Sequence, residues 1–448
     1  MMVLLYLFLL FVSGVPVFAI INKNSESVRS MNAFESLALT FNIGLFLFYL
    51  YYFALSLAGV SVNFYHFLPV AAVAFIGIVL IFVMRPKFGK YSADLMEILL
   101  LITFALSIIS LIVFSAQNRP IFPDEFSAWA VIPKINFFEG SLLYKQDYGF
   151  VKYPPFMTTV YSGFYHFIGR VDDMSVRIIQ PSISFVNLLG IYGYAKRKGY
   201  NGKFLLIMLS VFMVAYNDIA DFTASTYIDL VFACFYTLGC LYFIDILFSK
   251  NKLPYFLLSL FFMSIVSLIR PDGVYLLLFF IPIVLLDCLF REKRIKNAIW
   301  GASCIALSPI PFFCYEIFRK IMCVNAPPSD SSSPVVHELV VNMLTASFSQ
   351  LFLNKSWMVI IIACCLLLFL CAFYRKMDKK SAWLTFYCIA LIVMNIAFLD
   401  VCYIYKFGAE AGIAASFIRY MLRAVFVGMF ACLVLEKTLS GRGELENN

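Results

Sequence analysis

Charged residues are scarce in this chain. Only 13% of its 448 residues are Asp, Glu, Lys or Arg, and 62% are hydrophobic, whereas a soluble domain carries about 25% charged residues. Apolar runs of roughly 20 residues recur along the sequence, and each is long enough to cross a bilayer. The composition excludes a soluble globular domain and predicts an all-α, polytopic transmembrane helical bundle.

Other absences narrow the class further. The twelve cysteines show no metal-ligand spacing and mostly fall within apolar runs, so we interpret them as free thiols. The sequence has no nucleotide-binding loop, no convincing internal repeat and no large soluble domain. Its net charge of +8 is explained by membrane topology, so no nucleic-acid partner is expected. Residues 1–21 lack a basic leading segment, which favours a retained membrane helix over a cleaved signal peptide.

The apolar runs predict about thirteen membrane-spanning helices. We place them at residues 3–21, 38–59, 66–84, 95–116, 174–195, 203–217, 225–248, 254–269, 273–290, 297–318, 357–374, 382–402 and 417–436. The segment Pro155–Gly169 is apolar but short for a crossing. We expect it to form a juxtamembrane helix at the outer interface, with Tyr161, Tyr165 and His166 at headgroup depth.

Basic clusters in the loops predict the orientation, because cytoplasmic loops carry an excess of Lys and Arg. The clusters lie at Arg85–Lys90, Lys196–Lys203, Lys250–Lys252, Arg291–Lys296 and Arg375–Lys380. With all five inside, the C-terminal tail is inside as well. The remaining polar positions then share the outer face, which predicts a site there. These positions are Asp124, Glu125, Lys152, Tyr153, Asp218, Asp221, Arg270, Asp272 and Arg419.

The longest polar interruption runs from Gln117 to Phe156 and contains the adjacent pair Asp124 and Glu125. Pro123 precedes the pair and could open a short helix, whose N-terminus favours a carboxylate. One carboxylate could deprotonate an acceptor hydroxyl while the other orients it; the alternative is a solvated loop pair. The interruption closes on Lys152-Tyr153-Pro154-Pro155, which is either a helix-entry turn or a place where a lysine meets a lipid phosphate.

Two arginine motifs lie at the predicted outer boundary. Arg270-Pro271-Asp272-Gly273 has the composition of a tight turn, and its arginine could also bind a phosphate bidentately. Arg419-Tyr420, followed by Arg423, opens the last predicted span. These arginines are either membrane anchors or part of a site for an anionic headgroup.

Three aspartates near the outer boundary form a further candidate group. Asp218, Asp221 and Asp229 could line a sugar pocket or bind a divalent cation. The sequence names no metal ligands with certainty, and no cofactor is assigned.

Taken in order, these motifs resemble the GT-C class of polyprenyl-phosphate-sugar-dependent glycosyltransferases, which includes protein O-mannosyltransferases and aminoarabinose transferases. The matching elements are an acidic pair in an outer loop, Tyr153-Pro154-Pro155 before an interfacial helix, the Arg-Pro-Asp-Gly at 270–273, and Ser416-x-x-Arg419-Tyr420. Three features depart from the class pattern. Three spans precede the expected core, Lys152 precedes Tyr153 instead of adjoining the prolines, and no soluble C-terminal domain is apparent.

The resemblance implies a membrane glycosyltransferase with a polyprenyl-phosphate sugar donor and a lipid or cell-envelope glycan acceptor on the outer face of a bacterial plasma membrane. Asp124 would be the general base of an inverting transfer, with Glu125 beside it. Arg270, Arg419 and Lys152 would contact the lipid phosphate. Residues 95–436 would form the catalytic membrane domain with outer loop 117–173, preceded by accessory helices in 1–94 and followed by a cytoplasmic tail, 437–448.

Two other classes remain open. A transporter or flippase for a lipid-linked sugar would place carboxylates near the membrane midplane, whereas the polar residues here crowd one face. An O-antigen ligase-like or polymerase enzyme would keep glycan chemistry on the outer face but would use a diphosphate-linked lipid donor.

Overall fold

The computed structural model describes residues 2–89, 92–117, 129–143, 153–215, 228–291, 295–322, 377–402 and 413–440. At some helix ends, residues 413–421 among them, only the backbone is described. Every regular element in this part of the chain is helical, as predicted. The elements are α1 (Met2–Asn24), α2 (Glu26–Arg29), α3 (Ala33–Leu57), η1 (Phe64–His66), α4 (Phe67–Met84), α5 (Leu95–Gln117), α6 (Val131–Glu139), α7 (Phe156–Ile168), α8 (Asp173–Val176), α9 (Ile179–Arg197), α10 (Gly202–Ala215), α12 (Asp229–Phe248), α13 (Leu253–Ile269), α14 (Asp272–Leu277), α15 (Phe280–Leu286), η3 (Asp287–Arg291), α16 (Ile295–Leu307), α17 (Ile310–Met322), α20 (Lys379–Cys402) and α21 (Ile413–Leu439).

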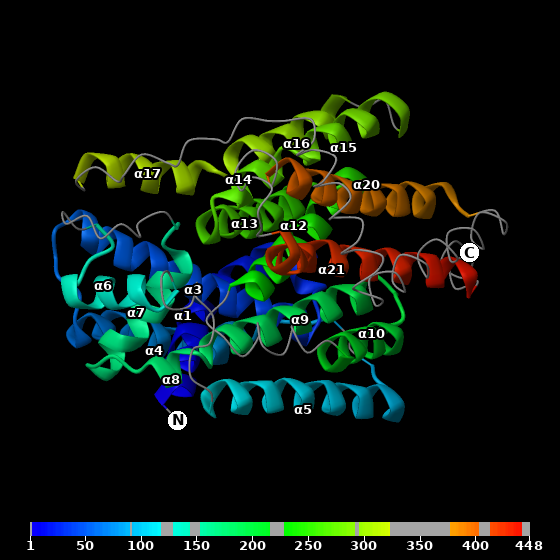
Figure 1. Cartoon of the computed structure of the whole chain (residues 1–448). Coiled ribbons are helices and arrows are strands. Elements are labelled where there is room, and N and C mark those ends of the chain that lie inside the picture. Colours follow the sequence, from blue (N-terminus) through cyan, green and yellow to red (C-terminus); the bar gives the residue numbers. More distant parts are fainter. Residues whose placement is uncertain are drawn as a thin grey trace.

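Long apolar helices dominate the bundle, and most lie roughly along one direction (Figure 1). Among the described residues, nine helices are long and apolar enough to cross a membrane. Two shorter apolar helices, Gly202–Met213 and Leu253–Ile269, coincide with further predicted spans. These helices confirm an all-α, polytopic membrane protein. The predicted span 357–374 lies outside the described residues, so the total of about thirteen stays a prediction.

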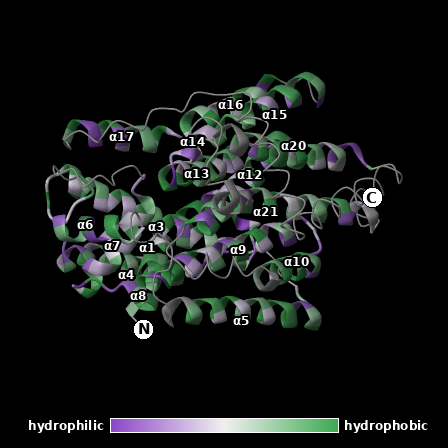
Figure 2. Ribbon diagram, in the orientation of Figure 1, coloured by the Kyte–Doolittle hydropathy of each residue, from purple (hydrophilic) through white to green (hydrophobic). Residues whose placement is uncertain are grey.

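Helix α12 forms the centre of the bundle. Its membrane-length window is 100% buried, whereas the corresponding windows of Phe64–Met84 and Leu95–Phe114 are only 22% buried. Helix α12 is apolar on all sides, which suits a central position, and α9, α13 and α21 pack against it. Helices α5 and α15 consist mostly of hydrophobic residues (Figure 2), and many of these are exposed, as expected of helices that face lipid.

The first helices pack closely against the rest of the chain. Helices α1 and α3 cross at Gly14 and Gly44, where a Cβ on Gly44 would lie 1.8 Å from the carbonyl oxygen of Leu10. Only glycine allows this approach, which is typical of membrane helix pairs. Helix α3 is joined in turn to α9, because Asn42 donates to Oδ1 of Asn187 over 2.7 Å. The separation of 1–94 as an accessory unit stays a prediction, and its helices share one hydrophobic core with the others.

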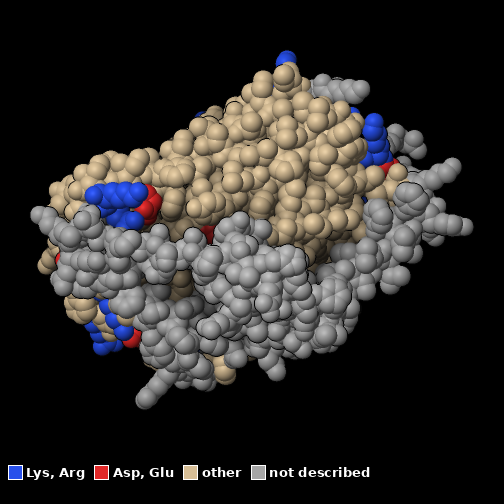
Figure 3. Space-filling model, turned by 45° about the horizontal axis from the view of Figure 1, so that its top comes forward, with Lys and Arg blue, Asp and Glu red and all other residues tan. Residues whose placement is uncertain are grey.

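Contacts between segments that are distant in the sequence define the two ends of the bundle. At the end that we call the loop end, the backbone of Val62 donates to Gly140 over 2.8 Å. At the other, which we call the basic end, Asn22 donates to the carbonyl of Lys87 over 2.9 Å and Lys196 pairs with Glu97 at 3.0 Å. In the space-filling view a broad uncharged face separates charged groups near its two ends (Figure 3). This sorting agrees with the predicted topology, and the side of the membrane that each end faces stays a prediction.

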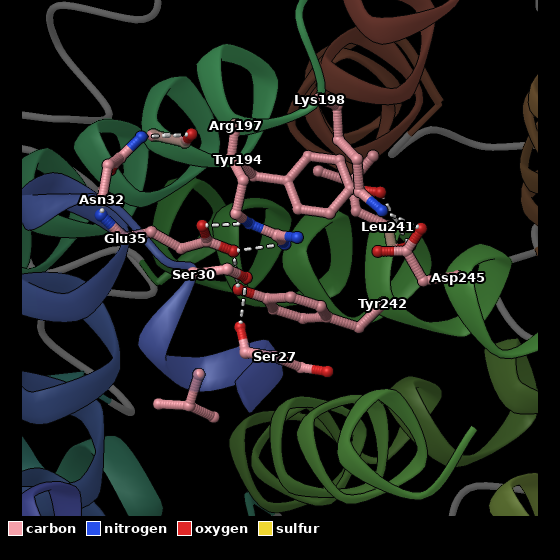
Figure 4. A network of polar contacts seen from close by, with 12 residues as sticks. Ser27, Ser30, Asn32, Glu35, Tyr194, Arg197, Lys198, Leu241, Tyr242 and Asp245 are labelled. Atoms are coloured by element: carbon pink, nitrogen blue, oxygen red, sulfur yellow. Dashed lines mark hydrogen bonds and ion pairs between the residues drawn. The ribbon is translucent and has the colours of Figure 1, made fainter. Parts of the chain in front are cut away.

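A buried polar network ties the helices together at the basic end (Figure 4). Arg197 donates from Nε and Nη2 to the two carboxylate oxygens of Glu35, over 2.7 and 2.8 Å. Tyr242 donates to the same carboxylate over 2.7 Å, and Lys198 pairs with Asp245 at 2.6 Å. The network therefore links α3, α9 and α12 at one level of the bundle.

Helix α7 is formed by the segment that we expected at the outer interface. It has only 13 residues, so it is too short to cross a membrane, in agreement with the prediction. Tyr161 and Tyr165 are 0% exposed and His166 is 4% exposed. These side chains contact protein instead of lipid headgroups, because α6 and α3 pack over the helix. Their depth in the membrane stays a prediction.

Candidate active site

Two arginines and two aspartates from four segments form a buried cluster toward the loop end. Arg270 donates from Nη1 to Asp229 over 2.6 Å and from Nε to Asp272 over 2.8 Å. Arg423 donates from Nη1 to the other oxygen of Asp272 over 3.0 Å. We call these four residues the arginine–aspartate cluster. It joins the first residue of α12, the end of α13, the start of α14 and the side of α21.

The local sequence explains how Arg270 reaches the cluster. Helix α13 ends at Ile269, Arg270 is extended with φ −145° and ψ 144°, and Pro271 starts the next turn. The residue before a proline favours this extended conformation. A Cβ on Gly273 would lie 2.4 Å from the carbonyl oxygen of Val266, so glycine is required at that position. The predicted tight turn is confirmed, and it directs Arg270 toward α12.

The cluster is shielded from solvent to different degrees. Asp229 is 4%, Arg270 9% and Arg423 2% exposed, whereas the side chain of Asp272 is 20% exposed. The ring of Phe232 lies 5.8 Å from the guanidinium of Arg270 and 5.6 Å from that of Arg423. Both arginines thus have an aromatic face as well as carboxylates. The four formal charges cancel, so an arriving anion has to compete with a carboxylate, and Asp272 is the most accessible one.

Tyr153 and Trp129 form an aromatic platform at the start of α7, and two prolines follow Tyr153. The ring of Tyr153 packs on Trp129 with 4.7 Å between centroids. Pro154 and Pro155 are buried, and Phe156 contacts Phe235 of α12 with 6.1 Å between centroids. The predicted Tyr-Pro-Pro element therefore enters a helix whose first residue contacts the central α12.

Polar contacts near the C-terminal end of α7 hold it against the neighbouring helices. Lys134 pairs with Asp173 at 2.6 Å, and Tyr165 donates to the same carboxylate over 2.9 Å. The hydroxyl of Tyr52 lies 2.9 Å from Nε2 of His166. Burial lowers the pKa of His166 to about 4, because a buried imidazolium loses its hydration.

The structure describes only part of the predicted site. Arg270 and Asp272 are brought into direct contact, and Tyr153 begins the platform. Asp124, Glu125, Lys152, Asp218 and Asp221 lie outside the described residues. Arg419 and Tyr420 fall on the backbone of α21, and their side chains are outside the description.

The sequence alone gives little indication that two residues, Arg423 and Asp229, belong to the cluster. Arg423 was assigned to the boundary of the last span, but α21 begins at Ile413 and places Arg423 well inside the helix. A charged residue at that depth needs a partner from a neighbouring helix, and the partner is Asp272. Asp229 was grouped with Asp218 and Asp221, although it directly begins an uninterrupted apolar helix. The same sequence signal could identify both positions: each is a charged residue within or next to an apolar helical segment.

Metal binding receives no support from the described part of the chain, where no three His, Cys, Asp or Glu side chains come together. The arginine–aspartate cluster itself places a guanidinium next to each carboxylate, which disfavours a cation there. A divalent cation bound by the aspartates of residues 218–229 stays a prediction.

The fold and this cluster define an integral membrane protein with a polar site near one end of its helices. Residues 152–315, more than a third of the chain, match the family model described as dolichyl-phosphate-mannose-protein mannosyltransferase. No curated protein and no solved structure matches the chain. The family match confirms the resemblance predicted from the motifs and supports a membrane glycosyltransferase with a polyprenyl-phosphate sugar donor. The matched segment begins at Lys152 and includes Tyr153, Asp229, Arg270 and Asp272.

Proposed function

We propose that this protein transfers a sugar from a polyprenyl-phosphate donor to a lipid or cell-envelope glycan. The family match over residues 152–315 carries the proposal, because it contains Tyr153 of the aromatic platform and three members of the arginine–aspartate cluster. The reaction would take place on the outer face of a bacterial plasma membrane. The described residues Lys87, Lys196 and Lys198 lie at the opposite end of the bundle, which supports this orientation.

The transfer is a single inverting displacement. Asp124 accepts the proton of the acceptor hydroxyl while the hydroxyl oxygen attacks the anomeric carbon. The bond between that carbon and the phosphate oxygen breaks, and polyprenyl phosphate leaves with the bonding electrons. Glu125 orients the acceptor or the sugar. No glycosyl-enzyme intermediate is needed, because phosphate is already a good leaving group.

Arginines stabilise the negative charge that grows on the leaving phosphate. Asp229 and Asp272 hold the guanidinium of Arg270 at two of its nitrogens, which fixes its position before the donor binds. The donor phosphate replaces Asp272 as a partner of the arginines, since Asp272 is the most exposed member of the cluster. Arg419 and Lys152 supply further positive charge to the same phosphate.

The experiment that tests this function measures sugar transfer and donor binding on the same purified preparations. Asp124→Asn keeps the side-chain shape but removes the proton acceptor. We expect transfer to fall by about 10²–10⁴, as is usual for the loss of a general base, with donor binding retained. Glu125→Gln is the matched control on the adjacent residue and should reduce transfer less.

Each outcome of this experiment assigns a role. Wild-type turnover in Asp124→Asn removes Asp124 from the mechanism. An inactive Glu125→Gln beside an active Asp124→Asn exchanges the two roles. If the wild-type protein transfers no sugar from any polyprenyl-phosphate donor in a small panel, the proposed function is wrong.

A further inference from the structure

A stripe of polar side chains runs along one face of α9 and into the core. Its members are Arg177, just before the helix, then Gln180, Ser184 and Asn187. The spacings of three, four and three residues keep them on one face. Arg177 is 2% exposed and the other three are 0% exposed. Since buried polar groups are nearly always hydrogen-bonded, each member should have a partner.

Gln180 differs from its neighbours in the stripe. Ser184 donates to the carbonyl oxygen of Gln180 over 3.0 Å, and Asn187 bonds both Asn42 and the carbonyl of Ile183. Neither the Oε1 nor the Nε2 atom of Gln180 has a hydrogen-bond partner among the described residues. A fully buried amide with both polar atoms unpaired is costly to the folded protein. Such a side chain is retained at low cost where a ligand satisfies it.

Helix packing places Gln180 at the same level of the bundle as the candidate active site. Helices α9 and α12 run parallel, because Ser184, Tyr194 and Lys198 of one segment contact Cys234, Leu241 and Asp245 of the other. Gln180 precedes Ser184 by four residues, just as Leu230 precedes Cys234, so both lie about 6 Å further toward the loop end. Gln180 is therefore level with the first turn of α12. The first residue of that turn, Asp229, binds Arg270 on another flank of the helix.

We propose that Gln180 binds a hydroxyl group of the donor sugar. This inference rests on the proposed function and extends it to the sugar itself. An uncharged amide offers both donors and an acceptor, which suits a hydroxyl group better than a phosphate. The phosphate then lies at the arginines on one flank of α12, and the sugar extends past the first turn toward Gln180 on the other.

The test compares two lipids that differ only in the sugar. Dolichyl-phosphate mannose and dolichyl phosphate are titrated into the purified full-length protein in detergent, and binding is followed with thermal unfolding. Gln180→Met keeps the unbranched shape but removes both polar atoms. We expect the preference for the sugar-bearing lipid to fall about tenfold, the effect of one neutral hydrogen bond. Binding of dolichyl phosphate should not change, and the Tm without ligand should stay equal or rise.

Asn187→Leu is the matched control, because Asn187 is a buried amide on the same helix face with partners inside the protein. This substitution should lower the Tm and leave the ratio of the two affinities at the wild-type value. The opposite responses of the two variants distinguish a ligand-binding amide from a structural one.

The proposal is overturned if Gln180→Met lowers the Tm as Asn187→Leu does and keeps the wild-type preference for the sugar. It is also overturned if neither dolichyl-phosphate mannose nor dolichyl-phosphate glucose binds the wild-type protein more tightly than dolichyl phosphate. These readouts are separate from catalysis, because the transfer assay with Asp124→Asn tests the proposed function by itself. A sugar preference that depends on Gln180 would stand even if Asp124 were not the base.

Discussion

Both ends of this bundle bury ion pairs, but they connect them differently. Among the described residues of the basic end, Glu35 pairs with Arg197, Glu97 with Lys196 and Asp245 with Lys198, so that these three acids have three different bases. At the loop end the partners are shared, since Arg270 bonds both Asp229 and Asp272, and Asp272 also bonds Arg423. One-to-one pairs hold neighbouring helices in register. Shared pairs allow one partner to be exchanged while the other still holds the arginine.

The comparison shows that burial of charge does not by itself mark a reactive site. Glu35 is 1% exposed and Asp229 is 4% exposed, so the two ends are about equally shielded. The difference is the more accessible Asp272, through which an anion can reach the arginines. We therefore expect substitutions at the basic end to affect stability, and substitutions at the loop end to affect donor use.

The largest effect is expected at the basic end. Glu35→Gln leaves the buried Arg197 without its carboxylate, and breaking such a pair costs about 3–5 kcal/mol. The free energy of unfolding, measured by denaturant titration in detergent, should fall by this amount. Donor affinity of the folded fraction should not change.

A double substitution serves as the control for Glu35. Glu35→Gln combined with Arg197→Met removes the unpaired charge, so it should recover much of the lost stability. If Glu35→Gln alone has no effect on unfolding, the network is not the structural brace that its geometry indicates. The contrast between the two ends would then fail.

Much of the fold could be predicted from the sequence, because the determining features are local. Apolar runs determine where the helices lie in the sequence, and basic loops indicate which helix ends lie on the same side of the membrane. Long-range pairing could not be predicted. Glu35 and Arg197 are 162 residues apart, and no local pattern connects an acid near one helix start with a base at the end of another.

The candidate site shows the same limit. Arg270-Pro271-Asp272-Gly273 was found because turn chemistry is local. The residues that pair with this motif could not be predicted, because Asp229 is 41 residues away from Arg270 and Arg423 is 151 residues away from Asp272. Gln180 gave no indication in the sequence, because an amide on an apolar helix is ordinary until its burial and lack of partners are seen.

Mild acid should lower the stability contributed by the loop end and leave that of the basic end nearly unchanged. The pKa of buried His166 is lowered to about 4, whereas an unfolded chain protonates histidine near 6.5. The unfolded state therefore binds more protons between these values, and stability falls as the pH decreases from about 6.5 to about 4. The full difference is on the order of 3 kcal/mol. At the basic end the hydrogen bond from Lys203 lowers the pKa of Asp94 below its usual 3.8, so the Asp94 carboxylate stays mostly ionised over the same range.

Thermal unfolding of wild type and His166→Gln across this pH range measures the effect. The substituted amide can still meet the Tyr52 hydroxyl but has no titrating proton, so the wild-type loss between pH 6.5 and 4 should largely disappear. Only three histidines are present, so few other imidazoles titrate there. A wild-type protein whose Tm is flat over this range would show that His166 is not held neutral by burial.

The smallest effect is expected for donor use at the loop end. Arg270→Ala should weaken use of the polyprenyl-phosphate donor about ten- to hundredfold, since a hydrogen bond to a charged group is worth roughly 1.5–3 kcal/mol. Arg419→Ala should act in the same direction. Arg270→Ala also leaves Asp229 buried without this partner, so a loss of stability could be mistaken for a loss of binding.

Combining Arg270→Ala with Asp229→Asn separates the two contributions. The added substitution neutralises the buried carboxylate, so stability should return toward the wild-type value. Donor affinity should stay low, because the guanidinium that meets the phosphate is still absent. The measurement is donor binding together with thermal unfolding on wild type, Arg270→Ala and the double variant. If the double variant regains donor affinity along with stability, Arg270 acts only as a brace. The loop end would then resemble the basic end, and the phosphate site would have to be sought at Arg419 or Lys152.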